Sequence, residues 1–78
     1  MPVIASEGPY RFYFYSHEPN EPAHVHVQRD RSLAKFWLAP VELENSTRFS
    51  ARELRRIRAI IEERREAFLE AWHGWFDE

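Results

Sequence analysis

Apolar and polar residues alternate along the first half of the chain, which is the pattern of strands that bury one face. Three segments rich in aromatic or β-branched residues carry it: Tyr10–Tyr15, His24–Arg29 and Leu33–Leu38. A polar loop from Ser16 to Ala23 and a turn at Asp30 and Arg31 separate them. Met1–Ala5 and Val41–Leu43 are expected as short edge strands. The pattern therefore predicts a small antiparallel sheet of three or four strands.

The last third of the chain changes to helical spacing, with apolar residues three or four positions apart. Ser50 and Glu53 stand at the spacing of a capping box, in which hydroxyl and carboxylate each accept from the other residue's backbone amide. We expect one long C-terminal helix packed on one face of the sheet. The predicted fold is a single α+β domain over residues 1–78, with a β-sheet region at 1–44 and a helical region at 50–76.

Matching apolar positions across the strands fixes a register. If Tyr15 pairs with His24 and the turn is tight, one face of the sheet is entirely apolar. Its members are Phe12, Phe14, Val25, Val27, Ala34, Phe36 and Leu38. The opposite face then places His26 between Tyr13 and Lys35, and His24 between Tyr15 and Trp37. The turn has no glycine, so a longer loop that shifts the third strand by one residue stays an alternative.

Composition narrows the function classes. The chain has 78 residues, no cysteine and a net charge of −2. Disulfides and thiolate metal sites are therefore excluded, and a globally basic nucleic-acid binder is disfavoured. No apolar run approaches the ~20 residues that span a bilayer, and the N-terminal residues do not resemble a signal peptide. We expect a cytoplasmic protein with no membrane segment.

The most informative local motif is His24-Val25-His26, because residues two apart on a strand point to the same side. Two such histidines are half of a metal site, for example for zinc, and the missing ligands could come from His17 or Glu18 in the preceding loop, or from a second subunit. They could also act as acid and base in metal-free RNA cleavage, although no orienting carboxylate is evident. The ligand count is incomplete, so the sequence favours no cofactor, and it assigns no catalytic residue.

Aromatic and cationic residues surround the two histidines and define the predicted functional face. Its members are His24, His26, Tyr13, Tyr15, Lys35 and Trp37. Rings interleaved with cations, here including Arg11, are how open sheets bind single-stranded RNA. Protein interfaces are enriched in the same residue types. The negative net charge favours a protein partner over RNA.

Two further groups lie in the helical region. Arginines crowd its start, where a helix N-terminus attracts anions, and they form a candidate anion or acidic-partner site; a solvated charged face is the more ordinary interpretation. They are Arg48, Arg52, Arg55 and Arg56. Trp72, Trp75 and Phe76 follow helical spacing near the end, where they either join the core or form a homodimer contact.

Several strings together resemble the bacterial domain of unknown function 4160 family. They are Tyr13-Phe14-Tyr15-Ser16, Asn20-Glu21-Pro22-Ala23-His24-Val25-His26-Val27, Ala34-Lys35-Phe36-Trp37-Leu38, Phe49-Ser50-Ala51-Arg52-Glu53-Leu54 and Leu69-Glu70-Ala71-Trp72-His73. The chain departs from the family in having Ala23 where a second proline is common, and in lacking a glycine near Asp30.

The resemblance implies a small bacterial protein often encoded beside another short protein, hence one component of a toxin–antitoxin-like module. We accordingly expect a protein that acts by binding a second small protein. The alternative is an RNA-directed nuclease or a metal-binding protein that uses His24 and His26.

Overall fold

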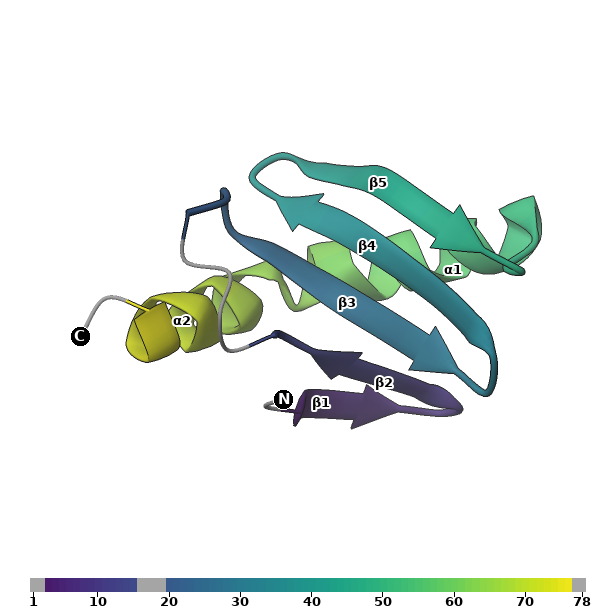
Figure 1. The fold of residues 1–78 in the computed structure, drawn as a ribbon, viewed down its shortest axis with the longest axis horizontal. Coiled ribbons are helices and arrows are strands. Elements are labelled where there is room, and N and C mark those ends of the chain that lie inside the picture. Colours follow the sequence, from purple (N-terminus) through teal and green to yellow (C-terminus); the bar gives the residue numbers. More distant parts are fainter. Residues whose placement is uncertain (1–2, 16–19, 77–78) are drawn as a thin grey trace.

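The computed structural model describes residues 3–15 and 20–76 and has an α+β fold. Five strands form one antiparallel sheet in chain order (Figure 1). They are β1 (Val3–Glu7), β2 (Tyr10–Tyr13), β3 (His24–Arg29), β4 (Ser32–Leu38) and β5 (Val41–Thr47). The prediction of three or four strands was too low. Both expected edge strands are present, and β5 runs further than Leu43 because polar residues continue the pairing with β4.

The predicted register is confirmed where β2, β3 and β4 pair, although β2 ends at Tyr13 and so stops before the predicted pair of Tyr15 with His24. Tyr13 pairs with His26 across β2 and β3, and His26 pairs with Lys35 across β3 and β4. The turn at Asp30 is tight, and Asp30 has a φ of 55°. Aspartate is one of the few side chains that adopts this left-handed conformation at modest cost, so the turn forms without glycine.

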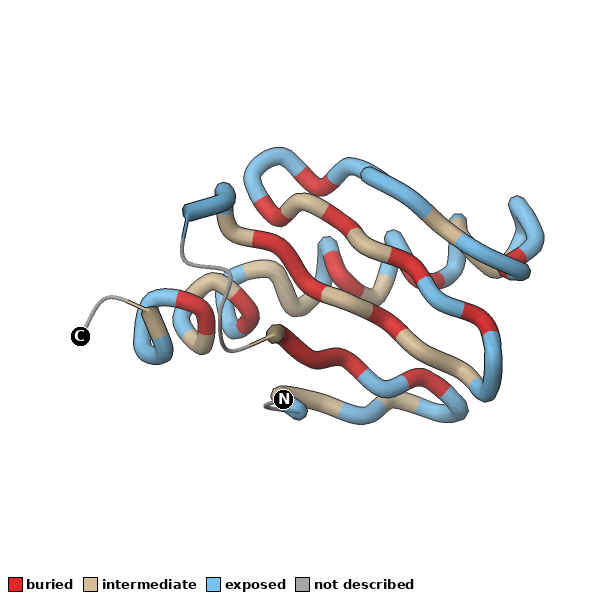
Figure 2. Tube along the Cα trace, viewed as in Figure 1, coloured by how far each residue is buried: buried red, intermediate tan, exposed pale blue. Residues whose placement is uncertain are grey.

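The predicted apolar face is the core. All seven of its side chains are at most 5% exposed, and helical residues such as Ile57, Ile61 and Phe68 cover them. Along β4 buried positions alternate with less buried ones (Figure 2). Burial of each large side chain contributes about 1.5–3 kcal/mol, so this face supplies most of the stabilisation available to a domain of this size.

The prediction of a single long helix was wrong in detail, because the helical region divides into α1 (Ala51–Glu63) and α2 (Arg65–Phe76). Arg64 joins them with φ −105° and ψ 14°, although its amide still donates to the Ile60 carbonyl at 3.0 Å. No proline or glycine marks this point. Beside it, the Arg65 Nε atom donates to the Leu38 carbonyl at 2.6 Å. We attribute the break to this tertiary contact, since the sequence has no helix-breaking residue here.

The break determines what the two helices cover. Helix α1 lies behind the sheet, and α2 extends past the end at which β3 begins (Figure 1). Phe68 of α2 packs on Phe12, whereas Trp72, one turn later, packs on Phe14 with ring centroids 5.2 Å apart. The C-terminal helix therefore closes one end of the sheet as well as part of its back.

Only one of the two hydrogen bonds of the predicted capping box forms at the start of α1. The Ser50 hydroxyl accepts from the Glu53 amide at 3.1 Å. The Glu53 carboxylate, expected to return to Ser50, instead accepts from the Tyr10 hydroxyl at 3.0 Å and from Arg29 at 2.7 and 2.9 Å. A residue assigned to local capping thus ties α1 to β2 and β3.

Candidate functional site

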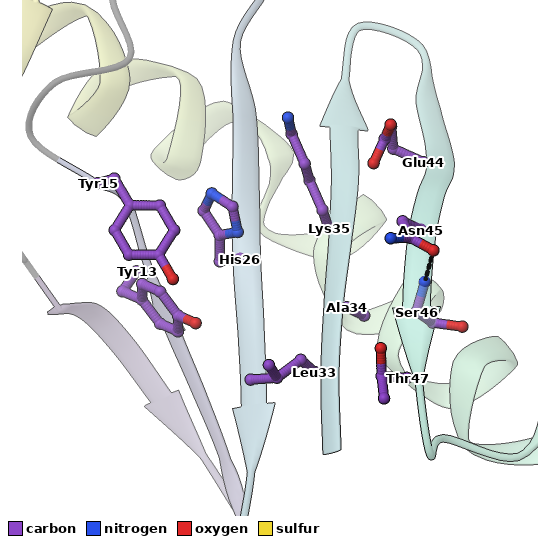
Figure 3. Close-up of a pocket in the computed structure, with 10 residues that line it drawn as sticks. All are labelled: Tyr13, Tyr15, His26, Leu33, Ala34, Lys35, Glu44, Asn45, Ser46 and Thr47. Carbon is purple, nitrogen blue, oxygen red and sulfur yellow. Dashed lines mark hydrogen bonds between the residues drawn. The ribbon is translucent and has the colours of Figure 1, made fainter. Parts of the chain in front are cut away.

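The side of the sheet away from the helices carries a hollow of about 210 Å³. Residues from four strands and from the chain just after β2 surround it (Figure 3). We call this side the open face and define it by Tyr13, Tyr15, His26, Leu33, Lys35 and Trp37. Strand alternation and the confirmed register bring these side chains together, and they include five of the six residues that the sequence placed on the functional face.

An aromatic group forms one wall of the hollow. The His26 ring stacks on Tyr13 with centroids 5.3 Å apart and an interplanar angle of 16°. Tyr15 meets His26 edge-on at 4.5 Å and 62°. Tyr13 is only 3% exposed, so it forms the floor of the hollow. It was expected to be part of the accessible surface. The accessible surface of this wall consists of the half-buried Tyr15 and His26.

Lys35 stands beside this wall and is already partnered. Its Nζ atom lies 2.6 Å from a carboxylate oxygen of Glu21 and 4.9 Å from the centre of the Trp37 ring. The ion pair removes most of the free positive charge from the middle of the open face. Glu44, across the hollow on β5, adds a negative charge.

His24 differs from His26 although both point to the same side of β3. Its side chain is fully buried, which corrects its place on an accessible surface. Trp72 of α2 covers it, with ring centroids 4.7 Å apart, and Trp37 packs against it edge-on. Its Nδ1 atom lies 2.9 Å from the Pro22 carbonyl, so we assign the proton to Nδ1 because a carbonyl can only accept.

The metal interpretation gains no third ligand. Over residues 3–15 and 20–76, no group of three or more histidine, aspartate or glutamate side chains is placed to hold an ion. The ring centroids of His24 and His26 lie 5.1 Å apart, and the two rings are nearly perpendicular. His17 and Glu18, the other ligands considered from the sequence, lie outside the described residues.

The four arginines of the candidate anion site do not converge. Arg48, Arg52 and Arg55 are exposed, and of these three Arg55 lies beside Leu43 of β5. Arg56 instead lies near Tyr10 on the β2 side, where it partly offsets the burial that raises the pKa of this phenol. A pocket for one anion is thus not formed by all four.

The three C-terminal aromatic residues differ in how far they are exposed. Trp72 is 5% exposed and belongs to the chain's own packing. Phe76 packs against Trp72 with ring centroids 4.2 Å apart and an interplanar angle of 45°, and it is half-buried. Trp75, at 48% exposed, is the member that remains available for a homodimer contact.

Sequence reasoning missed the charged cluster of Tyr10, Arg29 and Glu53. Hydrogen bonds from Arg29 lower the pKa of Glu53 below its ordinary value, and burial with the Glu53 contact raises the pKa of Tyr10. Arg29 also lies over the Phe49 ring at 5.7 Å. The cluster joins α1 to the sheet on the side opposite the open face, so its role is structural. Its only sequence signal, the spacing of Ser50 and Glu53, pointed to the cap instead.

Comparison with family models decides the relationship that the motifs suggested. The model of a domain of unknown function, DUF4160, matches residues 10–73. The chain belongs to this family. The match extends from β2 into α2 and includes the whole open face. No curated protein and no solved structure matched the chain. In the described part of this family member, no helix is both long and apolar enough to cross a membrane.

Proposed function

We propose that this protein acts by binding a second small protein through its open face. The observation that carries the proposal is an ordered aromatic surface around Tyr15 and His26, beside the part of this side where Trp72 of α2 covers His24. Tyr15 and His26 are held by ring contacts, and Lys35 is held by Glu21 and Trp37. Such side chains lose little conformational entropy on binding, and tyrosine and tryptophan are enriched at interface hot spots.

Charge favours a protein over RNA as the occupant. A phosphate backbone is bound mainly by unpaired lysines and arginines. On the open face Lys35 is paired with Glu21, and Glu44 lines the hollow. Leu33, 42% exposed at its lower rim in Figure 3, adds an apolar contact. A near-neutral surface with aromatic and aliphatic contacts suits a folded partner.

The nuclease alternative is weaker for a geometric reason. A metal-free mechanism needs two groups that reach the same substrate, one as acid and one as base. His24 is buried beneath Trp72, whereas His26 faces the hollow. A pair that cannot meet one substrate does not support acid–base catalysis by both histidines.

The test begins with tagged protein purified from its host and the co-purifying protein identified by mass spectrometry. The complex is then rebuilt from purified components and titrated calorimetrically. Leu33→Glu should weaken binding by at least about 2 kcal/mol, since it places a charge in a desolvated interface. Trp75→Glu is the matched control, an exposed apolar residue on α2. Loss of the complex with Trp75→Glu but not with Leu33→Glu would overturn the proposal.

The finer proposal is that the pair is a toxin–antitoxin-like module of the bacterial cytoplasm. The family resemblance supports it. Expression of one component alone should then slow growth, and co-expression of both should restore it. In the restored strain, Leu33→Glu should bring the growth defect back. Normal growth under every combination would leave a binding pair without toxicity.

A further inference from the structure

A second hollow, of about 120 Å³, opens where β5 meets α1 on the helix side of the sheet. Phe36, Leu43 and Leu54 form its apolar lining, and Arg55 and Arg58 stand at its rim. Leu43 is 42% exposed. A closed apolar cavity of about 150 Å³ accepts a benzene ring. The hollow therefore has room for one aliphatic side chain, with positive charge beside it.

The strand next to this hollow is an edge of the sheet. Among the described residues, β5 pairs with β4 on one side and with no strand on the other. An edge strand offers unpaired backbone amides and carbonyls to an added strand. In β5 the Val41 carbonyl already accepts from Arg58 at 3.0 Å and the Ser46 amide donates to the Asn45 side chain at 2.9 Å, so an added strand would pair between these two positions. Recognition by strand addition gains specificity from pockets for alternate side chains. The hollow lies where such a pocket is needed.

The arginines beside β5 are poorly compensated within the chain. Arg52, Arg55 and Arg58 follow each other at three-residue spacing in α1, so neighbours in this row lie close together. Arg58 pairs with Glu62 at 3.6 Å and donates to the Val41 carbonyl of β5 at 3.0 Å, so it is the compensated member of the row. In the described chain no carboxylate forms an ion pair with Arg52 or Arg55, and both are exposed. Their charges also oppose the helix dipole. An acidic partner would relieve both costs.

We propose that an extended acidic segment of a protein partner adds to β5 as a further strand. One aliphatic side chain of this segment fills the hollow beside Leu43. Strand periodicity puts the residues two positions before and after it on the same side, where acidic side chains face the arginine row. The proposal concerns a surface separate from the open face and does not depend on what binds there.

A second copy of the chain fits this site less well. Its own β5 carries Glu42 and Glu44, but Glu42 pairs with Trp37 and Glu44 lines the hollow of the open face. Paired edge to edge, two β5 strands would direct these carboxylates away from the arginine row. RNA also fits less well, because an apolar hollow for one side chain has no use for a phosphate or a base.

The probe is a peptide of the same length as β5, Thr-Glu-Thr-Leu-Thr-Glu-Thr, titrated into ¹⁵N-labelled full-length protein. We expect amide shifts concentrated in β5 and in the first half of α1. Binding should weaken with salt, since the ion pairs are exposed. The same peptide with lysine for glutamate, or with asparagine for leucine, should bind at least about tenfold more weakly.

The protein variant that tests the charges is Arg52→Glu with Arg55→Glu, which suits the helix dipole and should leave the fold intact. It should weaken peptide binding about tenfold or more. Arg11→Glu with Arg31→Glu makes the same charge change at exposed positions elsewhere and should leave binding unchanged. Equal losses in both double variants would overturn the proposal.

Three further outcomes would also overturn it. They are no amide shifts at a peptide concentration of about 1 mM, competition by a uridine oligonucleotide that binds the same amides more tightly, and concentration-dependent dimerisation through β5. None of them bears on Leu33→Glu and the open face, so failure here and failure of the proposed function are distinguishable.

Discussion

The two faces of the sheet use the same strands and nearly the same number of rings, yet they do different work. The helix-covered face is filled by phenylalanine, valine and leucine that are almost completely buried. The open face carries tyrosine, histidine, lysine and tryptophan that are held by ring contacts and one ion pair. The difference teaches that order on the open face does not come from burial in the core. Side chains that a small domain keeps ordered outside its core are candidates for recognition.

The largest expected difference between the faces is in stability. Phe36→Ala on the covered face should lower the free energy of unfolding by about 3–5 kcal/mol, because it leaves a cavity in a packed core. Leu33→Ala, three residues away on the same strand but on the open face, should change it by about 0.5 kcal/mol or less. Urea midpoints at constant m-value measure both. If Phe36→Ala does not fold, Phe36→Leu replaces it. Similar losses for the two faces would mean that the open face is part of the core.

The next difference separates the two histidines on the same side of β3. His24→Ala removes a ring packed under Trp72 and leaves the Pro22 carbonyl without its donor, so we expect a loss of about 2–3 kcal/mol. His26→Ala removes a half-buried ring and should cost about 1 kcal/mol or less. Equal costs in the same urea assay would show that the two side chains share one environment.

The pH dependence of stability should distinguish the charged cluster on the covered side from ion pairs elsewhere. The pKa of Glu53 is lowered by Arg29, so the folded state favours the carboxylate. Its contribution is present above the ordinary pKa of about 4.5 and is lost as the pH falls through the folded-state pKa. Urea midpoints should therefore fall on acidification in the wild type and fall less in Glu53→Gln. Glu62→Gln, at an exposed pair with Arg58, is the control and should keep the wild-type slope.

The smallest effect is expected from added metal. With His24 buried and its Nδ1 proton directed to Pro22, His26 is the member of the pair that faces the hollow. One accessible imidazole binds an ion weakly. Zn²⁺ in molar excess should leave the melting temperature unchanged in a thermal-shift assay. A clear rise that disappears in both His24→Ala and His26→Ala would restore the metal site considered from the sequence.

Alternation is what made the register predictable. Phe12, Val25, Val27 and Phe36 must share one face, and shifting any strand by one residue would expose them. That constraint alone placed Tyr13, His26 and Lys35 on neighbouring strands. The same argument could not find the end of β5, because its polar residues carry no strong preference between the two faces. Alternation also could not predict the break at Arg64. A contact with the sheet causes this break, and no proline or glycine marks it in the sequence.

The sequence also could not predict which side chains on the open side of the sheet are buried. Strand periodicity says which way a side chain points, but not what lies over it. His24 and His26 were equivalent in the sequence until Trp72, far along the chain, was seen to cover one of them. In the same way Glu53 had a satisfactory local role at the cap, so nothing in the sequence indicated Tyr10 and Arg29. Contacts between residues distant in sequence decide both cases.

The break at Arg64 has a consequence for motion. A rigid single helix would open only as a whole, with the core. At Arg64 the two helices still share backbone hydrogen bonds, and α2 is held on the sheet by Phe68, by the aromatic contacts of Trp72 and by the hydrogen bond from Arg65 to the Leu38 carbonyl. Sub-global opening of α2 needs less free energy than global unfolding. Opening of α2 with the sheet intact would remove the Trp72 cover from His24, while Trp37 of β4 would still pack against this histidine.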